Sequence, residues 1–335
     1  MNVSEPSKLN KHISLADNFS LLLKLASPQF KKNYGYVLTF KNGEQENSIK
    51  YEVAITYIKT IPEVARLFRI ERISKVYVND TEPDLLIDKL ANEAGSALYP
   101  MIVEVDFNGK FLAINNYQEI ADRWKTTRAK IKEYFTGDIS EQYCLLMDKT
   151  IALADLLTWK IQQDFLISTY FAPIYKSYTS ALKIEDDIAF PIAGSAMPVL
   201  FRVKQQLKEY LNELGTVELQ HGGIAIDSRS VADIENEHSF AFEKSANPDA
   251  GEFHGEYTAR YLLHAQSKAI RSINAQWILD LSRKRTITIS MHQIISDTDN
   301  TSADTDQQQG SSLVFIDREE KPEGIFSGIW KSLFG

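Results

Sequence analysis

Alternating apolar and polar residues first become regular on either side of Asn108-Gly109. Residues 101–107 alternate in this way, and apolar residues recur at 112 and 114. Asn-Gly readily adopts the positive φ angles of a type I′ turn, so the pattern predicts a β-hairpin. A two-residue turn at this dipeptide would pair Val105 with Leu112 and Val103 with Ile114.

A second Asn-Gly pair, Asn42-Gly43, separates residues 36–41 from an alternating run over residues 49–57. Both runs have the period of two that is typical of strands. A two-residue turn centred on this dipeptide would set the apolar Phe40 against the polar Gln45. We therefore expect two strands joined by a longer loop.

Helical periodicity dominates residues 117–171. Asn116 can cap the first helix, Glu119 can bond back from the third position, and Gly137 suits a C-terminal cap. Neither Gly nor Pro occurs over residues 140–172, and apolar residues there lie on more than one side of a helix. We expect this segment to be covered on more than one side and to lie centrally.

Four shorter segments complete this pattern. Residues 64–79 are rich in Arg, Ile and Val and predict another strand, and Glu82-Pro83-Asp84 has the composition of a helix start. Residues 198–214 fit both helical and strand spacing, and we favour a helix over a strand. Gly222-Gly223 lies between two apolar stretches and predicts a tight hairpin turn.

Three runs near the C-terminus, residues 253–263, 273–279 and 287–291, again alternate and predict an antiparallel meander. The expected fold class is therefore α+β, with a large curved antiparallel sheet of hairpins packed around helices from 117–171. Residues 1–295 form a single body in this interpretation, or two sheet-bearing halves flanking the helices. The outline is similar to that of half-barrel lipid carriers, a likeness of architecture without a shared motif.

The end of the chain has a different composition. Residues 296–312 contain four Asp, no basic residue and one apolar residue, which predicts a disordered acidic linker. Residues 313–335 are apolar again and predict a C-terminal docking segment with a short amphipathic helix. Its predicted partner-binding side chains are Ile325, Phe326, Ile329, Trp330, Leu333 and Phe334.

Charge and cysteine content exclude several classes of protein. The 37 Lys and Arg against 45 Asp and Glu give a net charge of −8, which disfavours nucleic acid as a partner. The basic residues Arg66, Arg69, Arg72 and Lys75, and the turn at 283–285, are too few for a nucleic-acid groove. The single cysteine, Cys144, excludes an intrachain disulfide and is expected to pack in a helix.

No segment resembles a membrane-spanning helix or an export signal. Apolar stretches stay well below the ~18 residues needed to cross a bilayer, and Lys24 interrupts the apolar patch near the N-terminus. We therefore expect a cytoplasmic protein for which a membrane partner is disfavoured.

Catalytic and metal-binding motifs are weak. The chain contains no G-x-G-x-x-G, no P-loop and no H-E-x-x-H motif. His221-Gly222-Gly223 and Ser195 lack the sequence context of an esterase site, and Glu185-Asp186-Asp187 is expected in a surface turn. The weak metal candidates are Glu252, His254 and Glu256, which alternation sets on one strand face; the same row suits a solvated face.

These patterns favour a non-catalytic interaction or assembly protein that docks on a protein partner, or on another copy of itself, through residues 313–335. The alternative is a carrier or binding module for an apolar ligand held between the curved sheet and the helices. An enzyme with an unrecognised site is the third hypothesis. We predict no catalytic residues and no cofactor.

Overall fold

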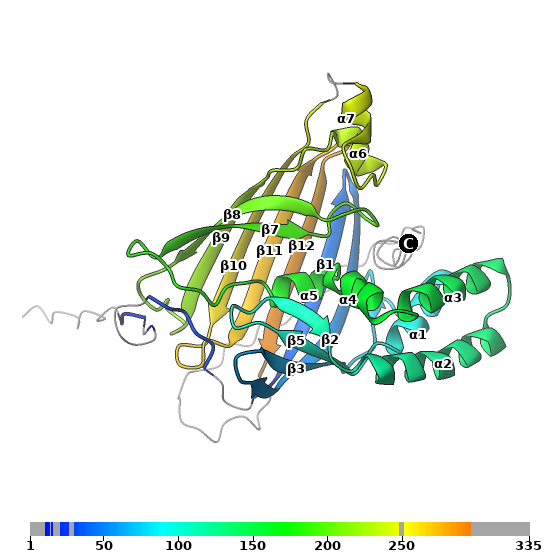
Figure 1. Ribbon diagram of the computed structural model, residues 1–335, viewed down its shortest axis with the longest axis horizontal. Coiled ribbons are helices and arrows are strands. Elements are labelled where there is room, and N and C mark those ends of the chain that lie inside the picture. The colour runs from blue at the N-terminus through cyan, green and yellow to red at the C-terminus, as the bar shows by residue number, and fades with distance from the viewer. Residues whose placement is uncertain (1–10, 14, 16–20, 27–29, 248–250, 296–335) are drawn as a thin grey trace, which may run out of the picture.

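The computed structural model describes residues 11–13, 15, 21–26, 30–247 and 251–295. These residues form an antiparallel sheet of twelve strands together with seven helices (Figure 1). The sheet is open, with β6 and β7 at its two edges, and its strands follow the order β6-β5-β3-β2-β1-β12-β11-β10-β9-β8-β7, with β4 paired to β2. The predicted large antiparallel sheet is therefore confirmed.

The strands are β1 (Lys31–Asn42), β2 (Gln45–Ile61), β3 (Ala65–Arg72), β4 (Tyr77–Val78), β5 (Met101–Val105), β6 (Phe111–Ile114), β7 (Lys183–Phe190), β8 (Val199–Leu207), β9 (Val217–Ala225), β10 (His254–Leu263), β11 (Ile270–Asp280) and β12 (Arg285–Ile294). The helices are α1 (Leu86–Ser96), α2 (Tyr117–Tyr134), α3 (Asp138–Ile151), α4 (Ala154–Gln162), α5 (Phe165–Tyr170), α6 (Val231–Glu235) and α7 (Phe242–Ala246).

The chain enters and leaves the sheet at its middle, because β1 pairs with β12. From β1 it moves outward to the edge strand β6, then runs through α2–α5, and re-enters at the opposite edge strand β7. The last six strands return from that edge to the middle. The helical connection must therefore cross the full width of the sheet, which brings part of it over one face.

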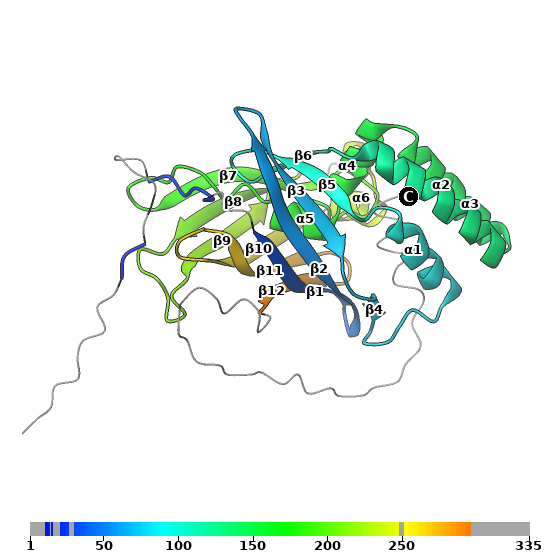
Figure 2. The ribbon, with the colours of Figure 1, turned by 90° about the horizontal axis from the view of Figure 1, so that it is seen from below.

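The helices of residues 117–171 lie in two different environments. Helices α2 and α3, which we call the arm, contact each other and α1 and extend beyond the sheet (Figures 1 and 2). Helix α5 instead lies against the sheet between its two edges. The expectation of one central helical segment is thus not confirmed for the arm, whose far side has no sheet to cover it.

The two Asn-Gly hairpins exist, with turns that differ from the prediction. Val103 pairs with Ile114 as expected, but Val105 pairs with Phe111, because an irregularity at Glu104/Val105 shifts the register. At the first hairpin the expected longer loop is wrong: Asn42 pairs with Gln45, so the turn has two central residues, of which Gly43 has a φ of 64°.

Two predictions in the second half of the sheet are wrong. Residues 199–207 form strand β8 rather than a helix, since every second side chain from Val199 to Leu207 is buried. Gly222 and Gly223 lie inside the continuous strand β9 rather than in a turn. A Cβ at Gly223 would lie 2.9 Å from Val203 Cγ2, so the close approach of β8 requires glycine there.

Other local predictions are correct in outline. Residues 64–79 supply β3 and β4, and the three C-terminal runs form β10, β11 and β12 as an antiparallel meander. Helix α1 begins at Leu86, just after the predicted start. Asn116 precedes α2, but its side-chain oxygen accepts from the Ile102 amide at 2.8 Å, so it ties α2 to β5 instead of capping the helix.

The predicted linker 296–312 and docking segment 313–335 lie outside the described residues, and both stay predictions. No helix in the described part of the chain is long and apolar enough to cross a membrane. The hydrogen-bonded strands of residues 31–294 form one continuous sheet, with β1 and β12 joining its two halves.

Candidate functional site

The segment that crosses the sheet is bound to it by buried tyrosines. We call residues 164–178, which comprise Asp164, α5 and the residues that follow it, the plug. The Tyr34 hydroxyl donates to the Ile270 carbonyl at 2.7 Å and lies 3.2 Å from the Tyr170 hydroxyl. The Tyr261 hydroxyl donates to the Thr169 carbonyl at 3.0 Å. Burial raises the pKa of Tyr34 and Tyr170 well above the ordinary range, so both stay neutral donors.

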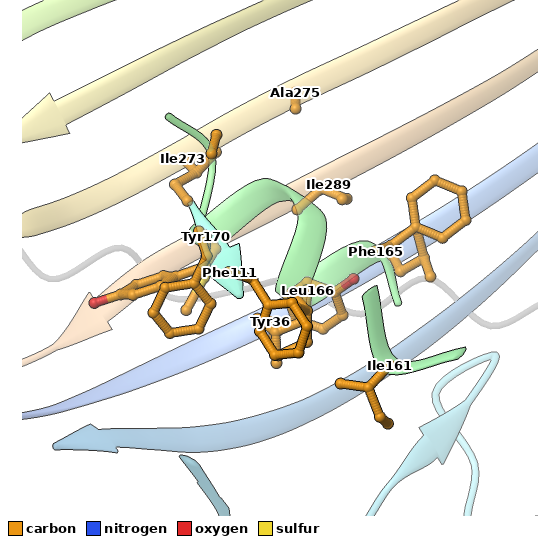
Figure 3. Close-up of a cluster of buried hydrophobic side chains, with 14 of the residues drawn as sticks. Tyr36, Phe111, Ile161, Phe165, Leu166, Tyr170, Ile273, Ala275 and Ile289 are labelled. Carbon is orange, nitrogen blue, oxygen red and sulfur yellow. The ribbon is translucent and has the colours of Figure 1, made fainter. Parts of the chain in front are cut away.

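Aromatic rings fill the space between the plug and the sheet. The ring of Phe165 packs edge-on against Trp277 of β11 at 5.7 Å and against Phe40 of β1 at the same distance. Figure 3 shows Phe165, Leu166 and Tyr170 beside the sheet residues Tyr36, Ile273, Ala275 and Ile289. The face of the sheet that the plug covers, here called the inner face, is therefore largely apolar.

Asp164 begins the plug. Its carboxylate accepts from the Ile167 amide at 3.0 Å and so caps α5. Burial raises the pKa of Asp164 to about 6, although the amides of Ile167 and Leu166 act in the opposite direction. Burial raises the pKa of the neighbouring Tyr36 well above its ordinary range, and the negative charge of Asp164 raises it further. The plug therefore begins at a carboxylate that titrates close to neutral pH.

The far end of the plug is held by Tyr175 and Lys176. The Tyr175 hydroxyl donates to the Lys268 carbonyl at 3.0 Å, and its amide donates to the Asn108 carbonyl at 2.9 Å. Lys176 Nζ lies 2.8 Å from the Asp186 carboxylate on β7. A Cβ at Gly109 would lie 2.8 Å from the Tyr175 ring, so Gly109 is needed both for its positive φ of 97° and for this contact.

Arg66 is a buried cation on the inner face. It lies on β3 one alternation before Phe68, whose ring packs against Phe171 of the plug at 5.5 Å. Only 2% of its surface is exposed, and no carboxylate of the described residues lies within ion-pair distance. Its guanidinium donates to the carbonyls of Phe107 at 3.3 Å and Leu25 at 3.4 Å.

These contacts leave the Arg66 charge poorly compensated. Both hydrogen bonds are long, and Nε has no partner among the described residues. Burial lowers the pKa of the guanidinium, though arginine remains charged in proteins. The Phe107 ring, 5.2 Å from the guanidinium carbon, supplies a weak cation–π contact. Buried charges are normally paired, so an acidic group is the partner that this side chain lacks.

A small, partly open cavity of about 20 Å³ adjoins Arg66. A cavity of this size holds about one water molecule. Apart from Arg66 its walls are mainly apolar and come from the sheet, the plug and the N-terminal segment. They comprise Leu25, Phe30, Phe68, Val105, Gly109, Tyr170, Phe171, Tyr175, Ala269 and Ile270.

Two further side chains of the inner face carry buried polar atoms without a hydrogen-bond partner among the described residues. His221 and Trp277 are both buried, and neither His221 Nε2 nor Trp277 Nε1 has a partner among the described residues. Burial lowers the pKa of His221 to about 3, so the imidazole is neutral. The sequence suggested a histidine at the edge of a turn, which is wrong because His221 points inward from the middle of β9.

The opposite face of the sheet is polar. Over β9–β12 it has a shallow hollow of about 510 Å³. Exposed hydroxyl and amide side chains such as Thr258, Asn274 and Gln276 line it, together with Arg260, which pairs with Glu218 at 2.6 Å. This composition is what a solvated sheet face requires.

The sequence-predicted metal candidates are not gathered into a cluster. His254 and Glu256 lie exposed on β10, while Glu252 precedes the strand and pairs with Lys244 Nζ at 3.0 Å. Within the described residues no three His, Cys, Asp or Glu side chains meet as a metal site.

The other candidates have structural partners. Glu185 and Asp187 lie on strand β7, not in a turn, and both pair with Arg202 of β8, Asp187 at 3.2 Å. The Ser195 hydroxyl donates to Glu237 at 2.5 Å. Cys144 is buried in α3 as expected, and burial raises the pKa of its thiol.

The sequence did not distinguish Arg66 from its basic neighbours. Arg69 on the same strand is exposed, while Arg72 is partly buried and donates to the Asn92 carbonyl at 3.4 Å. Three basic residues in one short strand are typical of a solvated face, and the first of them is buried by residues distant in the sequence, namely Leu25, Phe107 and the plug. No local pattern signals that burial.

Comparison with known proteins gives little further information. No family model matches the chain, and no curated protein matches it. A solved structure titled "Lipid-protein interactions in lipovitellin" is similar with a TM-score of 0.43 at 10% sequence identity. The similarity covers 85% of this chain and 27% of that one, so this chain spans about a quarter of its length. A TM-score this low carries no argument about function.

Proposed function

We propose that the protein is a non-catalytic binding protein for an apolar ligand that carries an acidic head group, held between the inner face of the sheet and the plug. The observation that supports the proposal is Arg66, a residue that is 2% exposed, has no acidic partner among the described residues and adjoins a small, partly open cavity. Of the predicted functions, this one corresponds to the apolar-ligand carrier.

The chemistry around Arg66 supports an acid with an apolar body. A carboxylate accepts two parallel hydrogen bonds from a guanidinium, which is stronger than the long bonds to the Phe107 and Leu25 carbonyls. Beyond the head group, a hydrocarbon chain would contact the apolar side chains of Phe30, Phe68 and Phe171. The other side-chain donors in the cavity wall are the hydroxyls of Tyr170 and Tyr175, which already bond to the Tyr34 hydroxyl and the Lys268 carbonyl, so a dianionic ligand is less well served than a monoacid.

The present cavity is far smaller than such a ligand, so binding requires part of the plug to move. The segment from Phe171 to Tyr175 forms one wall of the cavity. The Tyr175 hydroxyl holds this segment by donating to the Lys268 carbonyl, in the connection between β10 and β11. A hydrocarbon chain that replaced Phe171 would bury comparable apolar area, which limits the net cost of the exchange. We therefore expect ligand binding to increase hydrogen exchange of residues 171–175.

The test compares palmitate with hexadecanol, which has the same chain but a neutral head group. Purified protein is titrated with each, and displacement of a fluorescent fatty-acid probe is measured. Wild type should bind palmitate more tightly, and Arg66→Met should weaken palmitate binding at least about tenfold while leaving hexadecanol unchanged, the range expected for a charged hydrogen bond. Arg69→Met, an exposed arginine on the same strand, is the matched control.

The stability of the Arg66→Met variant separates a binding role from a structural one. Replacing an unpaired buried charge by an apolar side chain of similar length is neutral or stabilising. If Arg66 instead holds the Leu25 and Phe107 carbonyls in place, the variant should unfold at a lower urea concentration. No palmitate binding by wild type, or equal binding by both variants, would contradict the proposal.

Docking of residues 313–335 on a protein partner is the second candidate. The amphipathic pattern of residues 325–334 supports it. Comparing the partners recovered by wild type with those recovered by Trp330→Ala tests it directly. Equal recovery would remove this candidate.

A further inference from the structure

Helix α3 carries an exposed apolar face. Ile139 and Leu145 are each 55% exposed, Leu146 is 38% exposed, and Leu153, two residues beyond the helix, is 63% exposed. Ile139 and Leu146 are seven residues apart and lie on one side of α3, Leu145 lies on the same exposed half of the helix, and Leu153 follows α3 in the turn that leads to α4. Large apolar side chains that gather on one exposed half of a helix commonly mark an interaction surface, and we call these four side chains the exposed stripe.

The opposite side of α3 already has its own partners, so the exposed stripe is not a displaced core face. Cys144, Met147 and Ile151 are buried there. The arm is further fixed by Asp148, which accepts from Trp124 Nε1 at 2.8 Å and pairs with Arg128 at 2.8 Å. Helix α3 is thus apolar on two sides, of which the described residues cover one.

We propose that the occupant of the exposed stripe is the chain's own C-terminal segment, residues 325–334, docked along α3 as a third helix of the arm. The segment repeats apolar residues at helical spacing and matches the stripe in length. Ten helical residues span about 15 Å, and the fourteen residues of α3 span about 21 Å. This inference is independent of the proposed ligand site, because the two share no residue.

The connection is long enough for this docking. The described chain ends at Ile295 beside β12, and 29 residues, 296–324, separate it from the docking segment. Fully extended, they reach about 95–105 Å. A folded body of this size has a radius of gyration of about 19 Å, so the segment can reach any part of its surface.

The same connection favours the chain's own segment over another protein. A flexible tether holds its end at an effective concentration in the millimolar range. A helix that binds the stripe with micromolar affinity would then be docked about a thousand times more often than free. A second copy would need to reach millimolar concentration to compete equally.

The experiment measures amide hydrogen exchange of residues 325–334 in the full chain. Docking predicts slower exchange in wild type and at least a tenfold loss of that protection in the double variant Ile139→Glu, Leu145→Glu. Ile224→Glu is the matched control, since Ile224 is 61% exposed on β9 and far from α3 in the fold. Leu153→Glu, outside the helix, is the second variant if the double variant unfolds the arm.

Three outcomes would overturn the proposal. The first is exchange of residues 325–334 in wild type at the rate of an unstructured peptide. The second is protection that the α3 variants and the Ile224 control affect equally. The third is protection that rises with protein concentration together with dimer in sedimentation, which would make a second copy the occupant.

Discussion

The plug and the arm are consecutive helical regions of one chain, yet they are held in different ways. The plug is fixed by tyrosine hydroxyls that bond to backbone carbonyls and by aromatic rings packed against the sheet. The arm is fixed by helix-to-helix packing, by the partly exposed Arg128–Asp148 ion pair, and by two part-buried hydrogen bonds from α2 to α3, donated by Trp124 Nε1 to Asp148 and by the Tyr117 hydroxyl to the Ile151 carbonyl. The difference follows from topology, because the plug must cross the sheet whereas the arm extends beyond it.

The two regions should therefore differ in how strongly a substitution changes the free energy of unfolding. The side chains at the contact between plug and sheet are buried on both sides, so truncating one of them should lower the free energy of unfolding of the whole sheet. Exposed side chains of the arm can be changed with little effect on unfolding, and they are therefore free to serve an interaction. Substitutions of the same chemical type in both regions should differ in effect, and the following predictions rank these differences.

The largest effect is expected for Trp277→Ala. Trp277 is fully buried and its ring contacts those of Phe165, Phe190 and Tyr257. Truncation leaves a large cavity between sheet and plug and should cost about 3–5 kcal/mol of unfolding free energy. Tyr134→Ala on the arm, at a side chain that is 75% exposed, should change it by less than about 0.5 kcal/mol. Urea denaturation measures both, and similar losses would show that the arm is as integral as the plug.

The next effect depends on pH and concerns Asp164. Its pKa is about 6 in the folded protein against 3.8 for an ordinary carboxyl, so the folded state binds a proton more tightly. Stability should therefore rise as pH falls from about 6 to 4, and above pH 6 the charged group costs up to about 3 kcal/mol. Asp164→Asn keeps an N-cap without the charge.

The measurement is the stability difference between wild type and Asp164→Asn from pH 4 to 8. The variant should gain over wild type progressively from pH 4 and reach a constant advantage above about pH 6. A difference that is independent of pH would mean that the Asp164 carboxyl titrates in its ordinary range and that water reaches it.

A smaller loss is expected for Tyr34→Phe. The change removes one hydroxyl and leaves the Ile270 carbonyl without this donor, which should cost about 1–3 kcal/mol. Tyr134→Phe on the arm removes the same atom from a side chain that is 75% exposed and should cost almost nothing. Equal midpoints in urea for the two variants would contradict the role of tyrosines in anchoring the plug.

The sequence predicted the sheet far better than its connections. Period-two patterns identified β10, β11 and β12 because each strand buries one face only. In β8 the same alternation coincided with helical spacing, so the prediction of residues 198–214 was wrong. Gly222-Gly223 was misread as a turn, since glycine serves equally where two strands approach closely.

The candidate site was not predictable for a different reason. The burial of Arg66 arises from Leu25, Phe107 and Tyr175, which lie 41 or more residues away along the chain. Three arginines on one strand form a local pattern that indicates a solvent-exposed face. The N-terminal segment at Leu25, the hairpin residue Phe107 and the plug together decide which arginine loses its water.

The smallest effect is expected within the arm itself, at Asp148. Its carboxylate pairs with Arg128 at 2.8 Å, and both side chains are about one-third exposed, so the pair should contribute roughly 0.2–1 kcal/mol. Asp148→Asn removes the charge but keeps an oxygen that can accept from Trp124 Nε1. The loss should shrink in 1 M salt, where charges are screened beyond about 3 Å. Unfolding of wild type and variant in urea at low and high salt measures it. A loss that is large and unaffected by salt would contradict a screened, partly exposed ion pair and would mean that the Asp148 charge holds the arm as firmly as the buried contacts hold the plug.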